Sequence, residues 1–170
     1  MALQKIWKLK GFGGSEQLEL SQAEIPNASE DQVIIKNEAI GLNYLDIYFR
    51  TALYPWPNQE EIKILGSEAA GTVTEIGVGV KHLKVGDRVV YVVPVGAYAE
   101  YVSVHSKHVA KIPDPVSFDT AAASLLKGIT AYYLLHDTFS LKSGQTALVH
   151  AAAGGVGQLL GQWGSEIGAI

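Results

Sequence analysis

A glycine-rich stretch near the end of this 170-residue chain, Val149–Gly157, is its sharpest chemical signal. It reads A-x-x-G-x-x-G from Ala151 to Gly157 and so departs from the strict G-x-G-x-x-G pattern. Small residues here permit a tight turn, close approach of backbone N–H groups to a pyrophosphate, and packing of the next helix. The pattern therefore indicates a nucleotide-phosphate site, although a Gly/Ala-rich turn in an ordinary core fits it too. The expected contacts are Ala153, Gly154, Gly155, Val156 and Gly157.

A second group of polar residues lies between Asn43 and Arg50, directly after an expected strand. It includes Asp46 and Tyr48, and loop residues of this kind often carry function. Asn43 and Asp46 would equally suit the capping of a short helix. Both interpretations stay open at this point.

The residue types leave little room for a metal site. The chain has no cysteine, which excludes thiolate zinc sites, disulfides and a cysteine nucleophile in these residues. His105 and His108 are three residues apart, and on a strand this spacing directs them to opposite faces. We expect no metal ligands, and no Ser/His/Asp arrangement has motif support.

Composition narrows the possible partners. With 13 basic and 17 acidic residues the net charge is −4, so no basic field favours nucleic acid or an anionic membrane. Lysines interrupt the apolar N-terminus, which excludes a signal peptide there. The uncharged stretch from Ser143 to Ser165 is broken by six glycines, so it predicts buried soluble structure rather than a membrane span. A cytoplasmic protein is the expectation.

Short strands are expected to dominate the first two thirds of the chain, separated by Gly, Pro and Asn turns. Such spacing predicts a small closed or partly open barrel. The expected strands are Ala2–Lys10, Gln17–Gln22, Gln32–Ala39, Ala69–Ile76, Arg88–Val93 and Tyr98–Val104.

The pattern changes after Pro113-Asp114-Pro115. Helices are expected over Thr120–Leu126 and Ile129–His136, then a strand over Gln145–His150, the glycine-rich loop, and a helix from Gly155 to about Gly168. We therefore predict a barrel domain over residues 1–120, followed over 121–170 by linking helices and the first strand, loop and helix of an α/β nucleotide-binding domain. A parallel partner strand would have to follow that helix, so the second domain is expected to be incomplete.

In several stretches the chain resembles the zinc-independent quinone oxidoreductases of the medium-chain dehydrogenase/reductase family. The matching stretches cover nearly the whole chain in order: Ala39–Tyr48 with Arg50, Leu65–Gly71, Val85–Val89, Ala121–Ser124, Leu126–Ala131 and His150–Gly157. Members of this family are about twice as long. They consist of a GroES-like barrel, a Rossmann domain and a C-terminal return to the barrel, so this chain resembles their N-terminal half.

The resemblance also implies roles for individual residues. Asn43 and Tyr48 would line the cleft for nicotinamide and quinone, and Lys127 and Thr130 would lie against the cofactor, although a solvent-facing Lys127 is an equal alternative. Tyr54 matches the position of a proton-donating tyrosine in related enoyl reductases; packing is the alternative. Where zinc-dependent relatives have Gly-His-Glu, this chain has Gly66-Ser67-Glu68. Glu68 is expected to be a structural partner of the barrel backbone.

The resulting hypothesis is an NADPH-dependent quinone reductase, which passes hydride or single electrons to a quinone in an interdomain cleft without zinc. NADPH rather than NADH follows from the resemblance alone, because the residue that would read the ribose lies past Ile170. An enoyl or enone reductase and a non-catalytic truncated product remain alternatives. The intact protein is expected to be a homodimer, and the 170-residue chain alone is expected to be inactive.

Overall fold

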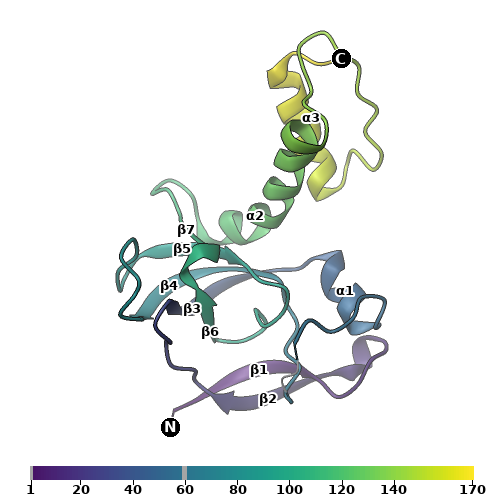
Figure 1. The fold of residues 1–170 in the computed structure, drawn as a ribbon. Coiled ribbons are helices and arrows are strands. Elements are labelled where there is room, and N and C mark those ends of the chain that lie inside the picture. The colour runs from purple at the N-terminus through teal and green to yellow at the C-terminus, as the bar shows by residue number, and fades with distance from the viewer. Residues whose placement is uncertain (1, 59–60) are drawn as a thin grey trace. The chain divides into compact units, whose positions relative to one another are not determined.

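A computed structural model describes residues 2–58 and 61–170, and these fall into two compact units, Met1–Ala123 and Ser124–Ile170 (Figure 1). The first unit is mainly β and the second is helical. None of the helices in the described residues has both the length and the apolar character needed to cross a bilayer.

The described residues of the first unit form two antiparallel sheets (Figure 1). A two-stranded sheet pairs β1 with β2, and a five-stranded sheet has the order β6-β3-β4-β5-β7. The strands are β1 (Leu3–Leu9), β2 (Leu18–Glu24), β3 (Gln32–Gly41), β4 (Glu68–Ile76), β5 (Arg88–Val92), β6 (Tyr101–His105) and β7 (Val109–Lys111). Short 3₁₀ turns at Ser15–Gln17 and Ser106–His108 precede β2 and β7.

Alternating side chains explain how this unit is held together. In β1 the buried positions alternate with exposed ones, and β3 and β4 supply fully buried residues to the same core. The inner faces of the strands thus enclose one apolar cluster, which includes Ile6, Val33, Ile35, Ala69, Val73, Val89, Tyr91, Val102 and Val104.

Two isolated bridges join the sheets into a barrel. Ile6 pairs with Ala99 and Lys8 pairs with Ile64, both antiparallel. The N–H of Asn37 on β3 donates to the carbonyl of Glu100 at 2.8 Å, so residues 98–100 connect β1 with β3. The predicted β barrel is confirmed, although the strand expected from Tyr98 begins only at Tyr101.

A short helix, α1 (Tyr44–Arg50), follows β3 where the residue pattern is compatible with either a functional loop or a capped helix. Asn43 is its N-cap residue, and Asp46 completes a capping box. The capping interpretation of both residues is therefore confirmed, and it does not preclude a further role.

The second unit differs from its prediction in two ways. The two expected helices are one continuous helix, α2 (Phe118–Tyr133), which a π-helical turn at Leu134–Thr138 extends. Gly128 does not interrupt it, because a glycine inside a helix costs only about 1 kcal/mol. The last helix, α3 (Gly155–Ile167), matches its expected start and ends at Gly168 in the left-handed conformation.

The strand expected over Gln145–His150 does not form. Within this segment, the N–H of Ala147 donates to the carbonyl of Ile170 at 2.9 Å, and the N–H of Ile170 donates to the carbonyl of Gln145 at 2.8 Å. Together these two hydrogen bonds are those that a pair of parallel strands forms at one residue. A parallel strand needs a longer row of partners, so the segment before the glycine-rich loop stays irregular.

Candidate functional site

The candidate site in the barrel is built around the start of α1. Asn43 has the extended backbone of an N-cap residue (φ −132°, ψ 151°), and its N–H donates to Oδ2 of Asp46 at 2.8 Å. Its side-chain amide points to another element and donates to Oε2 of Glu68, the first residue of β4, at 3.0 Å. Asn43 thereby ties α1 to the five-stranded sheet.

Asp46 is the centre of this arrangement and is only 5% exposed. In addition to the N–H of Asn43, its Oδ2 accepts the hydroxyl of Tyr98 at 2.9 Å. Its Oδ1 accepts the hydroxyl of Ser67 at 3.0 Å. One carboxyl therefore joins α1, the residue before β4, and the segment that links β1 to β3.

Burial and neighbouring charge set the acidity of this group. Burial raises the pKa of the Asp46 carboxyl, whereas the donors from Asn43, Tyr98 and Ser67 lower it. The negative charge of Glu68 acts in the same direction as burial. Burial, followed by the charge of Asp46, also raises the pKa of the Tyr98 hydroxyl, which therefore stays a donor at neutral pH.

The structure brings together the two tyrosines that the sequence singled out. The ring centroids of Tyr48 and Tyr54 are 5.3 Å apart, and the N–H of Tyr54 donates to the carbonyl of Tyr48 at 3.1 Å. The Tyr54 ring also meets Phe49 edge-on at 6.0 Å, yet Tyr54 remains 47% exposed. Its hydroxyl thus belongs to a packed ring that solvent still reaches.

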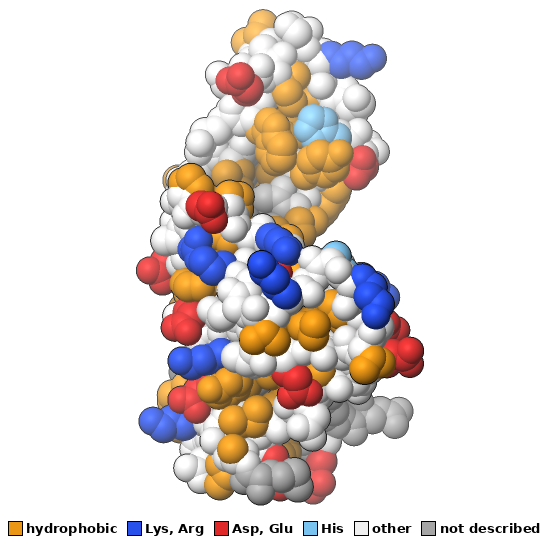
Figure 2. Space-filling model, turned by 90° about the vertical axis from the view of Figure 1, so that its left-hand side faces the viewer, with side chains coloured by type: hydrophobic (Ala, Val, Ile, Leu, Met, Phe, Trp, Pro, Cys, Tyr) orange, Lys and Arg blue, Asp and Glu red, His pale blue; other side chains and the backbone are white. Residues whose placement is uncertain are grey.

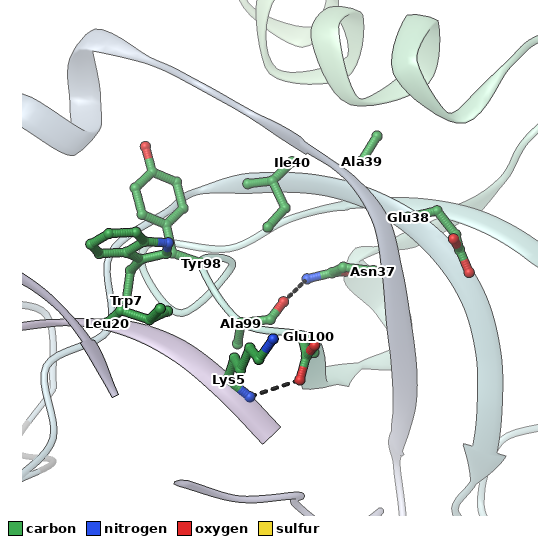
Figure 3. Close-up of a pocket in the computed structure, with 10 residues that line it drawn as sticks. All are labelled: Lys5, Trp7, Leu20, Asn37, Glu38, Ala39, Ile40, Tyr98, Ala99 and Glu100. Carbon is green, nitrogen blue, oxygen red and sulfur yellow. Dashed lines mark hydrogen bonds between the residues drawn. The ribbon is translucent and has the colours of Figure 1, made fainter. Parts of the chain in front are cut away.

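Two hollows in the barrel share the ring of Tyr98 as a wall. One, of about 340 Å³, is lined by residues of α1 and β2, among them Leu18, Asn43, Asp46 and Arg50. The other, of about 400 Å³, is drawn in Figure 3, where Trp7, Leu20 and Tyr98 gather at one end and Asn37 and Glu38 at the other. Both volumes are within the range of small-ligand sites.

The glycine-rich turn of the second unit has no space for a side chain at its last glycine. A Cβ on Gly157 would come within 2.3 Å of the carbonyl oxygen of Ala151 and 2.7 Å of the Ala152 Cα, so only glycine fits. Ala151 itself has a positive φ of 52°. The N–H of Gly154 closes the turn on the Ala151 carbonyl at 2.8 Å, and α3 starts one residue later. The first N–H groups of a helix have no intrahelical acceptor, so they are available to an anion.

The expected contacts in this turn differ in exposure. Ala153, Gly154 and Gly155 are exposed, Val156 is half-buried and Gly157 is buried. The carbonyl of Ala153 accepts the side-chain amide of Gln158 at 2.8 Å, which holds the loop against its helix.

Lys127 lies against the same turn, within the second unit. A Cβ on Gly155 would approach Cδ of Lys127 to 2.9 Å and Cε to 3.2 Å, so the aliphatic stem passes directly over that glycine. The hydroxyl of Thr130, also on α2, donates to the carbonyl of Leu126 at 2.8 Å. The structure thus brings Lys127 to the glycine-rich turn, and the Thr130 hydroxyl donates its proton within its own helix.

The histidine pair corrects one geometric expectation. His105 and His108 are not on opposite faces: their ring centroids are 6.1 Å apart. The reason is that β6 ends at His105 and a 3₁₀ turn follows, which changes the spacing rule. Among the described residues, no group of three or more His, Asp or Glu side chains is placed to hold a metal ion.

Sequence reasoning missed the partners of Asp46. Tyr98 was treated only as the start of a strand, and Ser67 only as the replacement of a histidine. Their contacts span 52 and 21 residues along the chain, so no local spacing could reveal them. The contact of Asn43 with Glu68 was missed for the same reason, although Glu68 was expected to be a structural partner.

Comparison with known proteins identifies related chains. Residues 29–114, half of the chain, match the model of the alcohol dehydrogenase GroES-like domain. The chain is 44% identical over 158 residues to quinone oxidoreductase 1 of Escherichia coli K12, which covers 92% of this chain and 48% of that protein. The chain therefore spans about half the length of the curated relatives that it matches.

Solved structures show the same similarity in three dimensions. The Escherichia coli quinone oxidoreductase complexed with NADPH superposes with a TM-score of 0.91 at 42% identity, covering 99% of this chain and 51% of that chain. The CurK enoyl reductase superposes with a TM-score of 0.89 at 27% identity, covering 98% of this chain and 52% of that chain.

Proposed function

Because the chain belongs to the alcohol dehydrogenase GroES-like domain family, we propose that it is the barrel and phosphate-loop portion of an NADPH-dependent quinone reductase. The reduction itself is proposed for the protein in its natural length. The chain supplies side chains for the reaction from the barrel and a phosphate-binding turn from the second unit.

The observation that carries the proposal is the construction of the glycine turn. Gly157 leaves no space for a Cβ, α3 begins at Gly155, and the stem of Lys127 crosses that glycine. These features suit a pyrophosphate at the helix start, with Gly154, Gly155 and Val156 offering backbone N–H groups. The relative solved with NADPH has the same fold, which supports NADPH as the cofactor. When bound, NADPH would supply a hydride or single electrons.

The barrel residues would position the reacting groups. Asn43 and Tyr48 are the proposed contacts to nicotinamide and quinone, and hydrogen bonds to Asp46 and Glu68 hold Asn43 in place. Such preorganisation lowers the cost of aligning the reacting groups.

The side chains around Ser67 suit a mechanism without zinc. Ser67 is 0% exposed and its hydroxyl faces Asp46 and the Pro94 carbonyl, and the chain supplies no thiolate. Quinones accept hydride without a Lewis acid, so this donor set and this substrate class agree.

Tyr54 is the proposed source of a proton when the acceptor needs one. Its phenol O–H is solvent-accessible and its ring is fixed by Tyr48 and Phe49. A phenol donates its proton only as a positioned general acid, and water is sufficient for a reduced quinone. We also propose a cytoplasmic location and a homodimeric natural protein, as the family resemblance implies.

An activated alkene is the second candidate substrate. The similarity to CurK enoyl reductase favours it, and an alkene acceptor would depend on the Tyr54 proton more than a quinone would. The two substrates therefore predict different sensitivities to the same substitution.

The test is NADPH oxidation by the natural protein, whose mass is measured first. We expect turnover with 1,4-benzoquinone, little turnover with crotonyl thioester, and nearly unchanged quinone turnover in Tyr54→Phe. Tyr132→Phe, at a tyrosine of α2 with similar exposure and no proposed role in the reaction, is the matched control. If the natural protein turned over the thioester faster than the quinone, and Tyr54→Phe abolished that turnover, the protein would be assigned as an enoyl reductase instead. Absence of both activities would support the non-catalytic alternative.

The 170-residue chain can be titrated separately with NADPH. Because the chain spans about half of its relatives, we expect binding weaker than micromolar. Submicromolar affinity would contradict the expectation that further residues complete the nucleotide site.

A further inference from the structure

The buried carboxyl of Asp46 has only the part of holding Asn43 in the proposed reaction, although three donors surround it. Oδ2 accepts the Asn43 N–H and the Tyr98 hydroxyl, and Oδ1 accepts the Ser67 hydroxyl. A buried carboxyl is stable only if its oxygens are hydrogen-bonded. These three donors therefore provide hydrogen bonds to both oxygens of an ionised Asp46 carboxylate.

Ser67 has a second acceptor within reach. Its Oγ is 3.0 Å from Oδ1 of Asp46 and 2.9 Å from the carbonyl oxygen of Pro94. A hydroxyl has one proton and two lone pairs, so it can donate to only one of these oxygens at full strength while accepting from another donor. The Pro94 carbonyl can only accept, so Ser67 is the donor whenever these two groups form a hydrogen bond.

We propose that Asp46 and Ser67 form a proton-holding site whose two charge states share one set of heavy-atom positions. With Asp46 ionised, Ser67 donates to Oδ1. With Asp46 protonated at Oδ1, that proton is donated to Ser67 Oγ, and Ser67 turns its own proton to the Pro94 carbonyl. The Asp46–Ser67 hydrogen bond is present in both states with its direction reversed, and Oδ2 keeps Asn43 and Tyr98 in both; the hydrogen bond from Ser67 to the Pro94 carbonyl forms only in the protonated state.

The charges around the site act in both directions: a neighbouring carboxylate favours proton uptake by Asp46, and a neighbouring cation favours its ionised form. Glu68 at the start of β4 brings a second buried carboxyl to the network through Asn43, and Arg50 is the cation on α1 that lines the same hollow as Asp46. Tyr98, on the facing segment, is neutral and donates to the carboxyl. Burial and the charge of Glu68 both raise the pKa of Asp46, so proton uptake is favoured over an exposed aspartate.

The consequence for the barrel site is a change of charge without a change of shape. Asp46 lines the 340 Å³ hollow together with Asn43, so its ionisation alters the field there by one charge. Asp46 is thus a positioning residue: it holds the Asn43 backbone whether or not it carries the proton. Only this consequence rests on the proposed function; the proton site itself does not.

The experiment is a carboxyl titration of the 170-residue chain by NMR, with ¹³C-labelled aspartate and ¹⁵N-labelled backbone. The Asp46 resonance is identified by its loss in Asp46→Asn, and Asp87→Asn is the matched control. We expect Asp46 to titrate above the ordinary aspartate value of about 3.9. The Asn43 N–H should stay protected from hydrogen exchange on both sides of that midpoint, because its hydrogen bond to Oδ2 persists in both states.

Two variants test the mechanism separately from the fold. Ser67→Ala removes the donor to the ionised form, so the Asp46 midpoint should rise further. Asp46→Asn reproduces the protonated arrangement, because its amide can donate to Ser67, so its Asn43 resonance should match the low-pH wild type. A midpoint at or below about 3.9, an Asn43 N–H that loses its protection from exchange on one side of the midpoint, an unfolded Asp46→Asn chain, or a Ser67→Ala midpoint that does not rise would each overturn the proposal. None of these measurements needs NADPH or a quinone, so the proton site can be disproved without disproving the proposed function, and the reverse also holds.

Discussion

In the barrel unit the candidate site consists of side chains bonded to one another, whereas in the second unit it consists of backbone at positions where side chains are absent. Asp46, Ser67 and Tyr98 form hydrogen bonds across three segments. In the glycine-rich turn the decisive features are the missing Cβ of Gly157 and the backbone N–H groups at the start of α3, which no side chain caps. The first site depends on packing of the whole unit, and the second on a local turn.

The two units also differ in how well they bury their apolar residues. In the barrel, Val33, Ile35 and Val89 are 0% exposed, and their strands, β3 and β5, each pair with a strand on both sides within the unit. In the second unit Leu148 is 86% exposed, in the segment that does not form the expected strand. Hydrophobic side chains are accordingly visible on its surface in Figure 2. The antiparallel strands of the barrel find their pairing partners within the unit. A parallel strand becomes buried only when further elements cover it on both sides.

The largest effect is expected for Gly157→Ala, which tests whether the second site is built from backbone alone. The added Cβ would meet two backbone atoms, so the turn must open. Overpacking against backbone costs about 3 kcal/mol, which would weaken NADPH binding roughly 100-fold. NADPH titration of the natural protein measures this. Wild-type affinity in a folded variant would mean that the turn does not bind the phosphates.

Substitutions of Asn43 test whether the barrel site depends on hydrogen bonds between side chains. Asn43→Ala removes both the cap and the donor to Glu68, and should cost about 2 kcal/mol in urea unfolding. Asn43→Ser keeps a capping oxygen and should recover about 1 kcal/mol. Equal losses in the two variants would show that the contact with Glu68, rather than the cap, carries the whole effect.

Two aspartates of the barrel should respond to pH with opposite sign. The hydrogen bond from Lys111 lowers the pKa of Asp87, so its contribution is present above the ordinary value and is lost as pH falls through the folded pKa. Burial raises the pKa of Asp46, so its contribution is present at low pH and is lost as pH rises through the folded pKa.

Urea unfolding between pH 3 and 7 compares these two groups. Asp87→Asn should lower stability at pH 7 by up to about 1 kcal/mol, because Lys111 is exposed, and less at pH 3. Asp46→Asn should gain stability relative to wild type as pH rises. Parallel pH profiles of the two variants would contradict the assigned directions.

The smallest effect is expected for Gly161→Ala, on the same helix as Gly157. Nothing lies within 4 Å of a Cβ at Gly161, so alanine should stabilise α3 by about 1 kcal/mol through helix propensity. Thermal unfolding measures the gain, and NADPH affinity should not change. A loss of affinity here would show that any added Cβ on α3 disturbs the site.

Much of the architecture could be predicted because its signals are local. The strand pattern with Gly and Pro turns predicted the barrel, and the glycine-rich turn predicted the start of α3. The failures have physical causes. A single helix runs through Gly128 because one glycine costs less than a helix break, and the strand before the turn lacks a row of partners.

The sequence by itself determined which residue types were present and which turns were possible: no cysteine for zinc, a small-residue turn for a phosphate, and an Asn-x-x-Asp start for α1. Only the tertiary structure decided that Asp46 meets Tyr98 and Ser67, and that Lys127 crosses Gly155. Turn chemistry depends on neighbours a few residues away, which sequence displays directly. A buried hydrogen-bond network depends on segments brought together by the packing of the whole barrel, and no spacing along the chain encodes it.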